Sequence, residues 1–295
     1  MRIKWSGMQE VEDIVRRLIE ITEVKLTGGW RGWIAVREGG KERFSKEEWE
    51  TLLAEPEKLA EGAQQTLKSD GANAVMVKYL ATGGRGVKAV MKRHQRGWGL
   101  RELLRSLGAA RAIRNFIAAV KMRQAGLPAA SPLAAVYRRK FLLCKESIYI
   151  SEYVEGVNLH EFLRRMPRDP KERYWTMREL SEQISEIFAE LHKRGLWHRD
   201  AKATNFIVSG DDTENYRVVL TDMDGIKSCS VRARNKQTRA LWRLAASVMQ
   251  LGVIYRTDYL RVFTAYCEKV GLPSEERAAI LRELSRKAQV KSRRV

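Results

Sequence analysis

His198-Arg199-Asp200-Ala201-Lys202-Ala203-Thr204-Asn205-Phe206 is the most informative stretch of this chain. A helical pattern leads into the stretch and the apolar run at 206–208 follows it, so we predict a loop between a helix and a short strand. The loop places a carboxylate at Asp200, an ammonium group at Lys202 and a carboxamide at Asn205. These groups can accept a proton, hold an anion and bind a divalent cation, which makes the loop a candidate site.

The spacing H-R-D-x-K-x-x-N is typical of the catalytic loop of protein-kinase-like phosphotransferases. In that interpretation Asp200 accepts or orients the proton of the attacking hydroxyl. Lys202 holds the γ-phosphate as charge develops, and Asn205 binds Mg²⁺. A surface loop with incidental charges is the alternative interpretation. The match of several fixed residues in a helix-loop-strand setting argues against that alternative.

A second acidic element follows the loop. The apolar run at 218–220 ends in Thr221-Asp222-Met223-Asp224-Gly225, which matches the place of the D-F-G motif. Asp222 comes directly after the predicted strand and is the candidate Mg²⁺ ligand, whereas Asp224 is the rival, with turn capping as its other role. No A-P-E triplet follows. Because protein kinases bind peptides through that region, its absence favours a small or lipid-linked acceptor.

The chain ahead of the loop has the pattern of a nucleotide-binding lobe. Strand-like runs at 66–68, 74–79 and 87–92 are separated by turn-forming segments, and the third ends in Lys92. Ala-Val-Met-Lys at that end matches V-A-I-K, so Lys92 is the candidate for contact with the α- and β-phosphates. The turn that contains Ser69, Asp70 and Gly71 is expected to cover the phosphates with its backbone N–H groups.

The run at 147–154 is predicted to be the strand and hinge that join two lobes, with backbone contacts to adenine at Glu152 and Val154. We therefore predict an α+β, bilobal, protein-kinase-like fold. Residues 1–151 form a small β-rich N-lobe in this prediction, and residues 152–295 form a larger, mainly helical C-lobe.

Helices are expected within the N-lobe at 8–21, 45–61 and 100–124. Apolar residues recur at helical spacing over 8–21, in an N-terminal extension. A basic helical region spans 100–124 and corresponds to helix C of a kinase. Helix C ordinarily carries a Glu that pairs with the phosphate-binding Lys, but Asn115 stands near that position and Glu102 lies upstream.

The charge of the chain is strongly positive. It has 295 residues, with 55 Lys and Arg against 36 Asp and Glu, which gives a formal net charge of +19. Such a surface favours an anionic partner, such as nucleic acid, acidic lipid headgroups or a phosphorylated glycan. The three cysteines are widely spaced and form no metal-binding or disulfide pattern, which favours a reducing compartment.

No signal-peptide pattern is visible, and no apolar run is long enough to span a membrane. We therefore expect a cytoplasmic protein whose membrane contact, if it has one, is peripheral. Basic residues gather just beyond the acidic turn, at Arg232, Arg234 and Lys236, with Arg239 and Arg243 further along. The candidates for contact with a substrate that bears carboxylates and phosphates are the first three, Arg232, Arg234 and Lys236, although a solvated helix face is an equally good interpretation.

Other elements are not general features of kinases. They include Gly97-Trp98-Gly99 and Arg234-Asn235-Lys236, together with Gly29-Trp30-Arg31-Gly32-Trp33, Leu67-Lys68-Ser69-Asp70-Gly71 and Gln124-Ala125-Gly126-Leu127-Pro128. With the catalytic loop and the acidic turn, they make most of the chain resemble the bacterial lipopolysaccharide core kinases of the WaaP heptose-kinase and Kdo-kinase type.

The resemblance implies transfer of the γ-phosphate of ATP to a heptose or Kdo hydroxyl of the lipopolysaccharide inner core. It implies ATP and Mg²⁺ as cofactors, with Lys92 on the phosphates, Asp200 as the base, and Asn205 and Asp222 on the metal. The partners it implies are a lipid A-core substrate and the anionic inner face of the inner membrane. Members of the family usually have Glu where this chain has Asn115, so Lys92 is positioned by Glu102, by Asp222 alone, or less firmly.

Three alternative functions compete with this hypothesis. A small-molecule phosphotransferase of the aminoglycoside or choline type needs an acidic acceptor pocket for its cationic substrate, which the charge of +19 disfavours. A basic nucleic-acid-binding protein lacks support, because the sequence has no zinc-finger, RRM or helix-turn-helix signature. A pseudokinase scaffold without catalysis is the third alternative.

Overall fold

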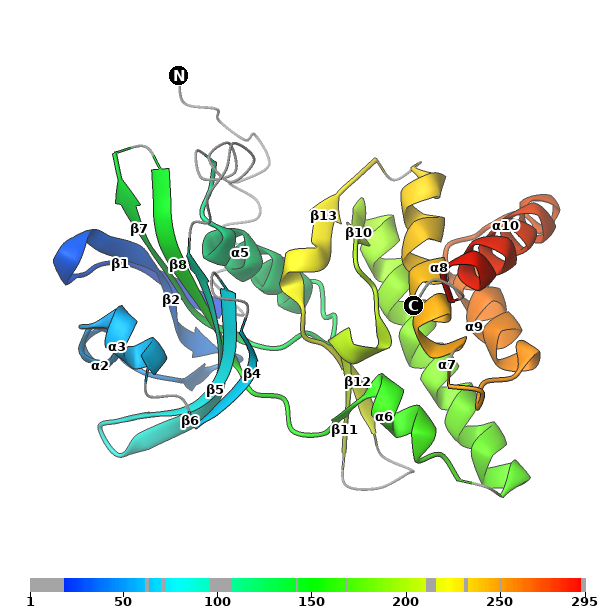
Figure 1. The fold of residues 1–295 in the computed structure, drawn as a ribbon, viewed down its shortest axis with the longest axis horizontal. Coiled ribbons are helices and arrows are strands. Elements are labelled where there is room, and N and C mark those ends of the chain that lie inside the picture. The colour runs from blue at the N-terminus through cyan, green and yellow to red at the C-terminus, as the bar shows by residue number, and fades with distance from the viewer. Residues whose placement is uncertain are drawn as a thin grey trace. The chain divides into compact units, whose positions relative to one another are not determined.

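The computed structural model of the chain describes residues 19–61, 64–69, 73–95, 108–141, 143–167, 169–210, 216–230, 233–249 and 251–292. The chain divides into two compact units. The first unit consists of the chain up to Gly126 together with Ala130–Tyr153. The second unit consists of Leu127–Ala129 together with the chain from Val154 onward. The first unit is built mainly on a sheet and the second mainly from helices, as Figure 1 shows.

An antiparallel sheet forms the first unit, in the order β1-β2-β7-β8-β6-β5-β4, with β3 paired to β2. Its strands are β1 (Ile19–Lys25), β2 (Trp30–Glu38), β3 (Lys41–Glu42), β4 (Gln65–Ser69), β5 (Asn73–Thr82), β6 (Arg85–Gln95), β7 (Pro132–Lys140) and β8 (Leu143–Glu152). Within the described part of this unit, the helices are α2 (Lys46–Leu52), α3 (Pro56–Glu61) and α5 (Arg111–Gln124).

The helix predicted over 8–21 is wrong at its C-terminal end. Residues 8–18 lie outside the described residues, and β1 begins at Ile19. The strand pairs with β2 along its whole length and buries Ile19 and Val24 against the sheet. These contacts with a distant segment override the local helical periodicity, as tertiary packing commonly does.

The two faces of the sheet are covered by different helices, with α2 and α3 on one face and α5 on the other (Figure 1). Trp49 of α2 is fully buried, donates its indole N–H to the carbonyl of Ala35 at 3.2 Å, and packs edge-on against Phe44. On the other face, Phe116 of α5 packs against Trp33 of β2. The sheet is therefore buried on both sides.

The second unit consists of helices around short strands. The helices are α6 (Leu159–Arg164), α7 (Pro170–Lys193), α8 (Arg234–Met249), α9 (Arg256–Lys269) and α10 (Ser274–Ser292). The strands are β9 (Val157–Asn158), β10 (Leu196–His198), β11 (Phe206–Ser209), β12 (Arg217–Leu220) and β13 (Ile226–Ser228). Among the described helices, none combines the length and the apolar character that crossing a membrane requires.

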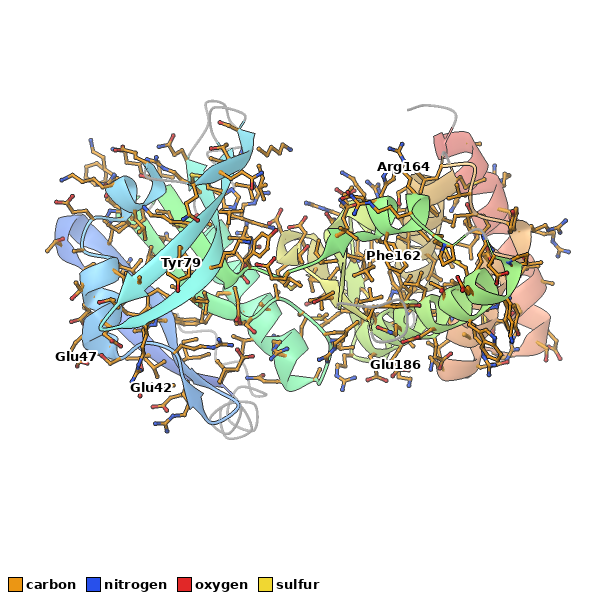
Figure 2. All side chains as sticks on the ribbon, turned by 90° about the horizontal axis from the view of Figure 1, so that it is seen from below. Glu42, Glu47, Tyr79, Phe162, Arg164 and Glu186 are labelled. Carbon is orange, nitrogen blue, oxygen red and sulfur yellow. The ribbon has the colours of Figure 1, made fainter. Side chains whose placement is uncertain are left out.

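Helix α7 is the central support of the second unit. Asp169 caps its first turn, and the helix ends before Gly195, whose φ of 65° is one that glycine adopts readily. One face of α7 is buried, and α7 packs against α9 while α8 packs against α10. Phe162 lies on α6 (Figure 2) and packs against Tyr216. The Tyr216 hydroxyl donates to the carbonyl of Thr176 on α7.

Replacement of Trp49 by alanine tests the packing of α2 on the sheet. We expect Trp49→Ala to lower the free energy of unfolding by about 3–5 kcal/mol, because it empties a large buried site and leaves the Ala35 carbonyl without its donor. Denaturant titration followed by circular dichroism measures this loss. Trp175→Ala removes the same side chain from a position that is 52% exposed and is the matched control. Equal losses for the two variants would contradict the assignment.

Candidate catalytic site

The loop at 199–205 lies between two short strands. The strand that follows the loop is predicted from the sequence, whereas the short strand β10 between the predicted helix and the loop is not. Strand β10 ends at His198 and pairs with β13, whereas β11 begins at Phe206 and pairs with β12. The acidic turn at 221–225 connects β12 to β13, so the same two strand pairs hold the loop and the turn together. Two backbone hydrogen bonds join them directly, from Arg199 N to Gly225 O at 2.7 Å and from Thr221 N to Asn205 O at 3.0 Å.

His198 connects the loop to the acidic turn with its side chain. Its imidazole is fully buried, and Nδ1 lies 3.2 Å from the backbone nitrogen of Asp200. A backbone N–H can only donate, so Nδ1 accepts and the proton of the neutral ring is on Nε2. Nε2 therefore donates to the carbonyl oxygen of Asp222 at 3.0 Å. One ring thus fixes the backbone at Asp200 and at Asp222.

Gly225 leaves room for this ring. A Cβ atom at position 225 would lie 2.1 Å from Cε1 of His198 and 2.6 Å from Nδ1. Because the ring is buried and held by hydrogen bonds at both nitrogens, it cannot turn aside as an exposed side chain would. The glycine of the acidic turn is therefore required by steric contact with His198.

The carboxylate of Asp200 is held by two cations. Lys202 Nζ lies 2.9 Å from Oδ2, and Arg243 Nη2 on α8 lies 2.6 Å from Oδ1. Partial burial alone would raise the pKa of Asp200, but the hydrogen bonds and charges of Lys202 and Arg243 outweigh it, so the pKa is lowered from its ordinary value. Asp200 is therefore ionised at neutral pH and can accept a hydrogen bond from a hydroxyl.

Asn205 and the acidic turn carry oxygen donors of the kind that Mg²⁺ prefers. The amide nitrogen of Asn205 donates to the backbone carbonyl of Asp200 at 2.8 Å, which leaves the amide oxygen as the part of the side chain suited to a cation. Asp222 lies next to Thr221, which is hydrogen-bonded to Asn205, whereas Asp224 lies 3.8 Å from Arg199. Within the described residues, no group of three or more His, Cys, Asp or Glu side chains is arranged to hold a metal. A carboxylate and an amide fit Mg²⁺, which keeps its remaining sites for phosphate oxygens and water.

The candidate nucleotide residues belong mostly to the first unit. Lys92 lies on β6 between Val75 and Tyr149 of the neighbouring strands. Met91 points into the core that faces α2, so the alternation of a strand directs Lys92 to the face that α5 covers. Ser69 is the exposed last residue of β4, and Asp70 and Gly71 lie outside the described residues.

The predicted hinge residues fall on both sides of the division between the units. Glu152 ends β8 in the first unit, and Val154 begins the second. The Glu152 carboxylate accepts two hydrogen bonds from Arg43, at 3.1 and 2.8 Å. Arg43 also lies 3.6 Å from Glu38, which in turn binds Arg123 of α5 at 2.7 Å. An ion-pair chain therefore connects α5 with the end of β8.

Helix α5 carries no acidic residue, as its sequence indicates. Asn115 is 1% exposed, and its amide nitrogen has no hydrogen-bond partner among the described residues. Glu102, the other candidate partner of Lys92, lies outside the described residues.

The basic residues after the acidic turn have separate environments. Arg234 begins α8, where its guanidinium lies 3.3 Å from the Gln237 amide oxygen and 3.9 Å from the Glu276 carboxylate. Lys236 is exposed on the first turn of α8, and Arg232 lies outside the described residues. Arg243 is the site residue that sequence reasoning missed, since it appeared there only as one of several basic residues. Its contact with Asp200 depends on how α8 packs, which no local motif reports.

Comparisons with known proteins agree with these features. The model of the lipopolysaccharide kinase (Kdo/WaaP) family matches residues 76–266. The solved structure described as WaaP in complex with acyl carrier protein superposes with a TM-score of 0.60 at 20% identity, covering 80% of this chain and 92% of that chain. This similarity confirms the predicted bilobal, protein-kinase-like α+β fold.

A shorter match is to the kinase and exchange factor for Rac A of Dictyostelium discoideum, which is 31% identical over 74 residues. That match spans 25% of this chain and 5% of the Dictyostelium protein. The family model, in contrast, covers well over half of this chain and includes Lys92, the catalytic loop and the acidic turn. The chain belongs to the lipopolysaccharide kinase (Kdo/WaaP) family.

Proposed function

We propose that this protein is an ATP-dependent kinase that phosphorylates a sugar hydroxyl, of heptose or Kdo, in the inner core of lipopolysaccharide. The observation that carries this proposal is the Asp200 carboxylate held beside Lys202, in a loop that His198 and two backbone hydrogen bonds join to the acidic turn. Membership of the lipopolysaccharide kinase family supports the choice of acceptor over an aminoglycoside or choline.

The roles of the side chains follow from their chemistry. Asp200 accepts a hydrogen bond from the sugar hydroxyl and aims its oxygen at the γ-phosphorus. Because the pKa of Asp200 is lowered, it takes the proton late in the transfer and acts first by orientation. Lys202 moves to the γ-phosphate, and Lys92 holds the α- and β-phosphates. Asn205 and Asp222 would hold Mg²⁺, which would supply positive charge for the phosphate oxygens.

The remaining predicted contacts belong to the same proposal. The turn with Ser69, Asp70 and Gly71 covers the phosphates, and the backbone at Glu152 and Val154 binds adenine. The basic residues Arg232, Arg234 and Lys236 bind the carboxylates and phosphates of the acceptor. The first turn of α8 contains no acidic residue, which supports binding of an anionic substrate there.

Asp200→Asn tests the base assignment. We expect this variant to retain its fold and to lose about 100-fold or more in kcat, because a neutral amide cannot accept the proton. Purified protein, ATP, Mg²⁺ and dephosphorylated core lipopolysaccharide are combined, and mass spectrometry of the released core oligosaccharide measures the phosphate added. Equal transfer by variant and wild type would overturn the assignment. If the wild-type protein binds ATP but transfers phosphate neither to this acceptor nor to an aminoglycoside, the pseudokinase scaffold is favoured.

Two isosteric variants separate the candidate metal ligands in the same assay. Asp222→Asn is expected to raise the Mg²⁺ concentration needed for half-maximal rate, because it removes a charged oxygen ligand. Asp224→Asn removes the same charge from a residue that lies near Arg199, and it is expected to leave that concentration nearly unchanged. The reverse ranking would assign the metal to Asp224.

We also propose that the second unit contacts an anionic membrane through a surface of stacked aromatic and arginine side chains. Tyr174, Trp175 and Tyr255 are 47%, 52% and 60% exposed. We call this surface the aromatic–arginine cluster, and it consists of Arg173, Tyr174, Trp175, Arg178, Tyr255 and Arg261. Tyr and Trp favour the headgroup level of a bilayer, and Arg binds lipid phosphates.

A buried carboxylate organises this cluster. Asp258 is 2% exposed and binds Arg173 at 2.7 Å and Arg261 at 3.3 Å. Arg173 stacks over Tyr255, and Arg261 stacks over Tyr174. The arginines are therefore held with their aromatic partners in place, which reduces the entropy lost when the surface binds.

A cavity of about 720 Å³ adjoins the cluster. Asp258, which binds two arginines of the cluster, also lines the cavity, as does Arg256. Most of its other lining side chains are apolar and come from α6 to α10, among them Leu163, Ile184 and Phe263. We propose this cavity as a binding site for an acyl chain, which either a lipid or a carrier protein can present. The solved WaaP structure contains an acyl carrier protein, which supports the second source.

Vesicle sedimentation tests the membrane contact. We expect the protein to bind vesicles that contain phosphatidylglycerol more tightly than vesicles of phosphatidylcholine alone. Arg178→Gln is expected to weaken that binding by roughly 1 kcal/mol, or about fivefold, and Trp175→Ala to weaken it as well. Tyr79→Ala, on β5 of the first unit, removes an aromatic side chain of similar exposure and is the control (Figure 2). If both cluster variants bind as wild type does, the cluster is not the membrane surface.

A further inference from the structure

Helix α8 contacts the catalytic loop with two side chains that lie one turn apart. Arg243 donates to the Asp200 carboxylate at 2.6 Å, and the hydroxyl of Ser247 accepts from the backbone N–H of Ala203 at 2.9 Å. The Ser247 hydroxyl also donates to the carbonyl of Leu244 in its own helix, which fixes its orientation. The loop therefore rests on α8 through both its backbone and its acidic side chain.

The two cations on Asp200 differ in how firmly they are held. Lys202 belongs to the loop itself, and its side chain is 52% exposed. Arg243 is 18% exposed and comes from a helix of the C-terminal unit that is packed against α10. Its guanidinium lies beside the ring of Trp242, and its Nε is buried without a partner among the described residues. Lys202 can leave Asp200 at little cost, whereas Arg243 is confined by its surroundings.

We propose that Arg243 is a positioning residue that anchors Oδ1 of Asp200 throughout the reaction. Lys202, in contrast, leaves Asp200 and contacts the phosphate. This inference rests on the proposed function for the role of Asp200 as the base. The anchored carboxylate keeps one oxygen on the guanidinium and presents the other, Oδ2, to the hydroxyl of the acceptor. Arg243 touches neither nucleotide nor acceptor in this arrangement.

The arrangement gives each oxygen of Asp200 a separate task. As the acceptor oxygen forms its bond to the γ-phosphorus, the bond from that phosphorus to the bridging oxygen of ADP breaks. The hydroxyl proton passes to Oδ2 of Asp200 and then to water, and ADP keeps the electron pair of the broken bond. Oδ1 remains on Arg243, so the carboxylate does not rotate away when Lys202 leaves.

Among the described residues, the other groups around Asp200 do not replace this anchor. On the loop, Lys202 contacts Oδ2, and from β10 the neutral His198 ring bonds the backbone N–H of Asp200 and not its carboxylate. On the acidic turn, Asp222 bonds His198 through its carbonyl, and Asp224 lies near Arg199. Once Lys202 has moved to the phosphate, Arg243 is the cation among the described residues that remains in contact with the Asp200 carboxylate.

Kinetics over a range of pH test this role. Arg243→Gln is expected to lower kcat by about 100-fold, with the KM for ATP nearly unchanged, because the base is misplaced while the nucleotide contacts remain. The pKa of Asp200 is lowered in the wild type, so loss of the guanidinium raises it. The acidic limb of the kcat profile, where Asp200 becomes protonated, therefore moves to higher pH.

Matched variants separate positioning from general damage. Arg239→Gln removes the same charge from an exposed position one turn earlier on α8, and it is expected to leave kcat and the limb unchanged. Arg243→Lys keeps the charge and is expected to have the acidic limb of its kcat profile at the wild-type pH. Its kcat is expected to lie between those of the wild type and Arg243→Gln. If Arg243→Gln retains the wild-type kcat and limb, the proposal is wrong. If Arg243→Gln does not fold, Arg243→Lys is the deciding variant. An acidic limb of its kcat profile that is displaced as far as expected for complete loss of the charge would contradict the proposal.

A measurement without acceptor separates this inference from the proposed function. Carboxyl carbons of Asp are labelled with ¹³C, and the Asp200 signal is assigned by its absence in Asp200→Asn. We expect Arg243→Gln to raise the pKa of this signal and Arg239→Gln to leave it unchanged, whether or not a core sugar is the substrate. An unchanged Asp200 titration in Arg243→Gln would show that Arg243 is not the anchor of Asp200. If the titration is shifted but no core sugar is phosphorylated, the acceptor assignment alone is wrong.

Discussion

The hydrogen bonds of His198 are the constraint on which the catalytic geometry of this chain depends. A single neutral ring accepts from the backbone of Asp200 and donates to the backbone of Asp222, so the positions of the candidate base and the candidate metal ligand are not independent. The strand pairs β10–β13 and β11–β12 bring the two segments together, and the ring sets their final separation. The contribution of His198 is therefore geometric.

The electrostatics of the loop favour a base that stays ionised. Lys202 and Arg243 both contact Asp200, and their charges outweigh the effect of its partial burial. A carboxylate with a lowered pKa is a weak base, and it suits phosphoryl transfer because little proton transfer is needed before the bond to the leaving group has broken. The same cations, together with the net charge of +19, favour an acceptor that already bears negative charge.

Much of the fold could be predicted from the sequence, because its strongest signals are local. The strand after the catalytic loop lies where it is predicted, and Lys92 and the acidic turn follow from motifs with fixed spacing. The start of β1 at Ile19 could not be predicted, since pairing with β2 overrides a helical period that is just as visible in the sequence. Arg243 could not be assigned for a related reason. Its partner lies 43 positions away in the chain, and only the packing of α8 brings the two together.

Gly225 has a consequence for how the site can move. The His198 ring fills the space that a side chain at 225 would take. The acidic turn and the catalytic loop are therefore packed in direct contact at this point. The turn cannot swing outward alone, since such a motion would break the bond from His198 to Asp222 and open a void beside a buried ring. An inhibitor that displaces the acidic turn must therefore also bear the energetic cost of disordering the loop that carries Asp200.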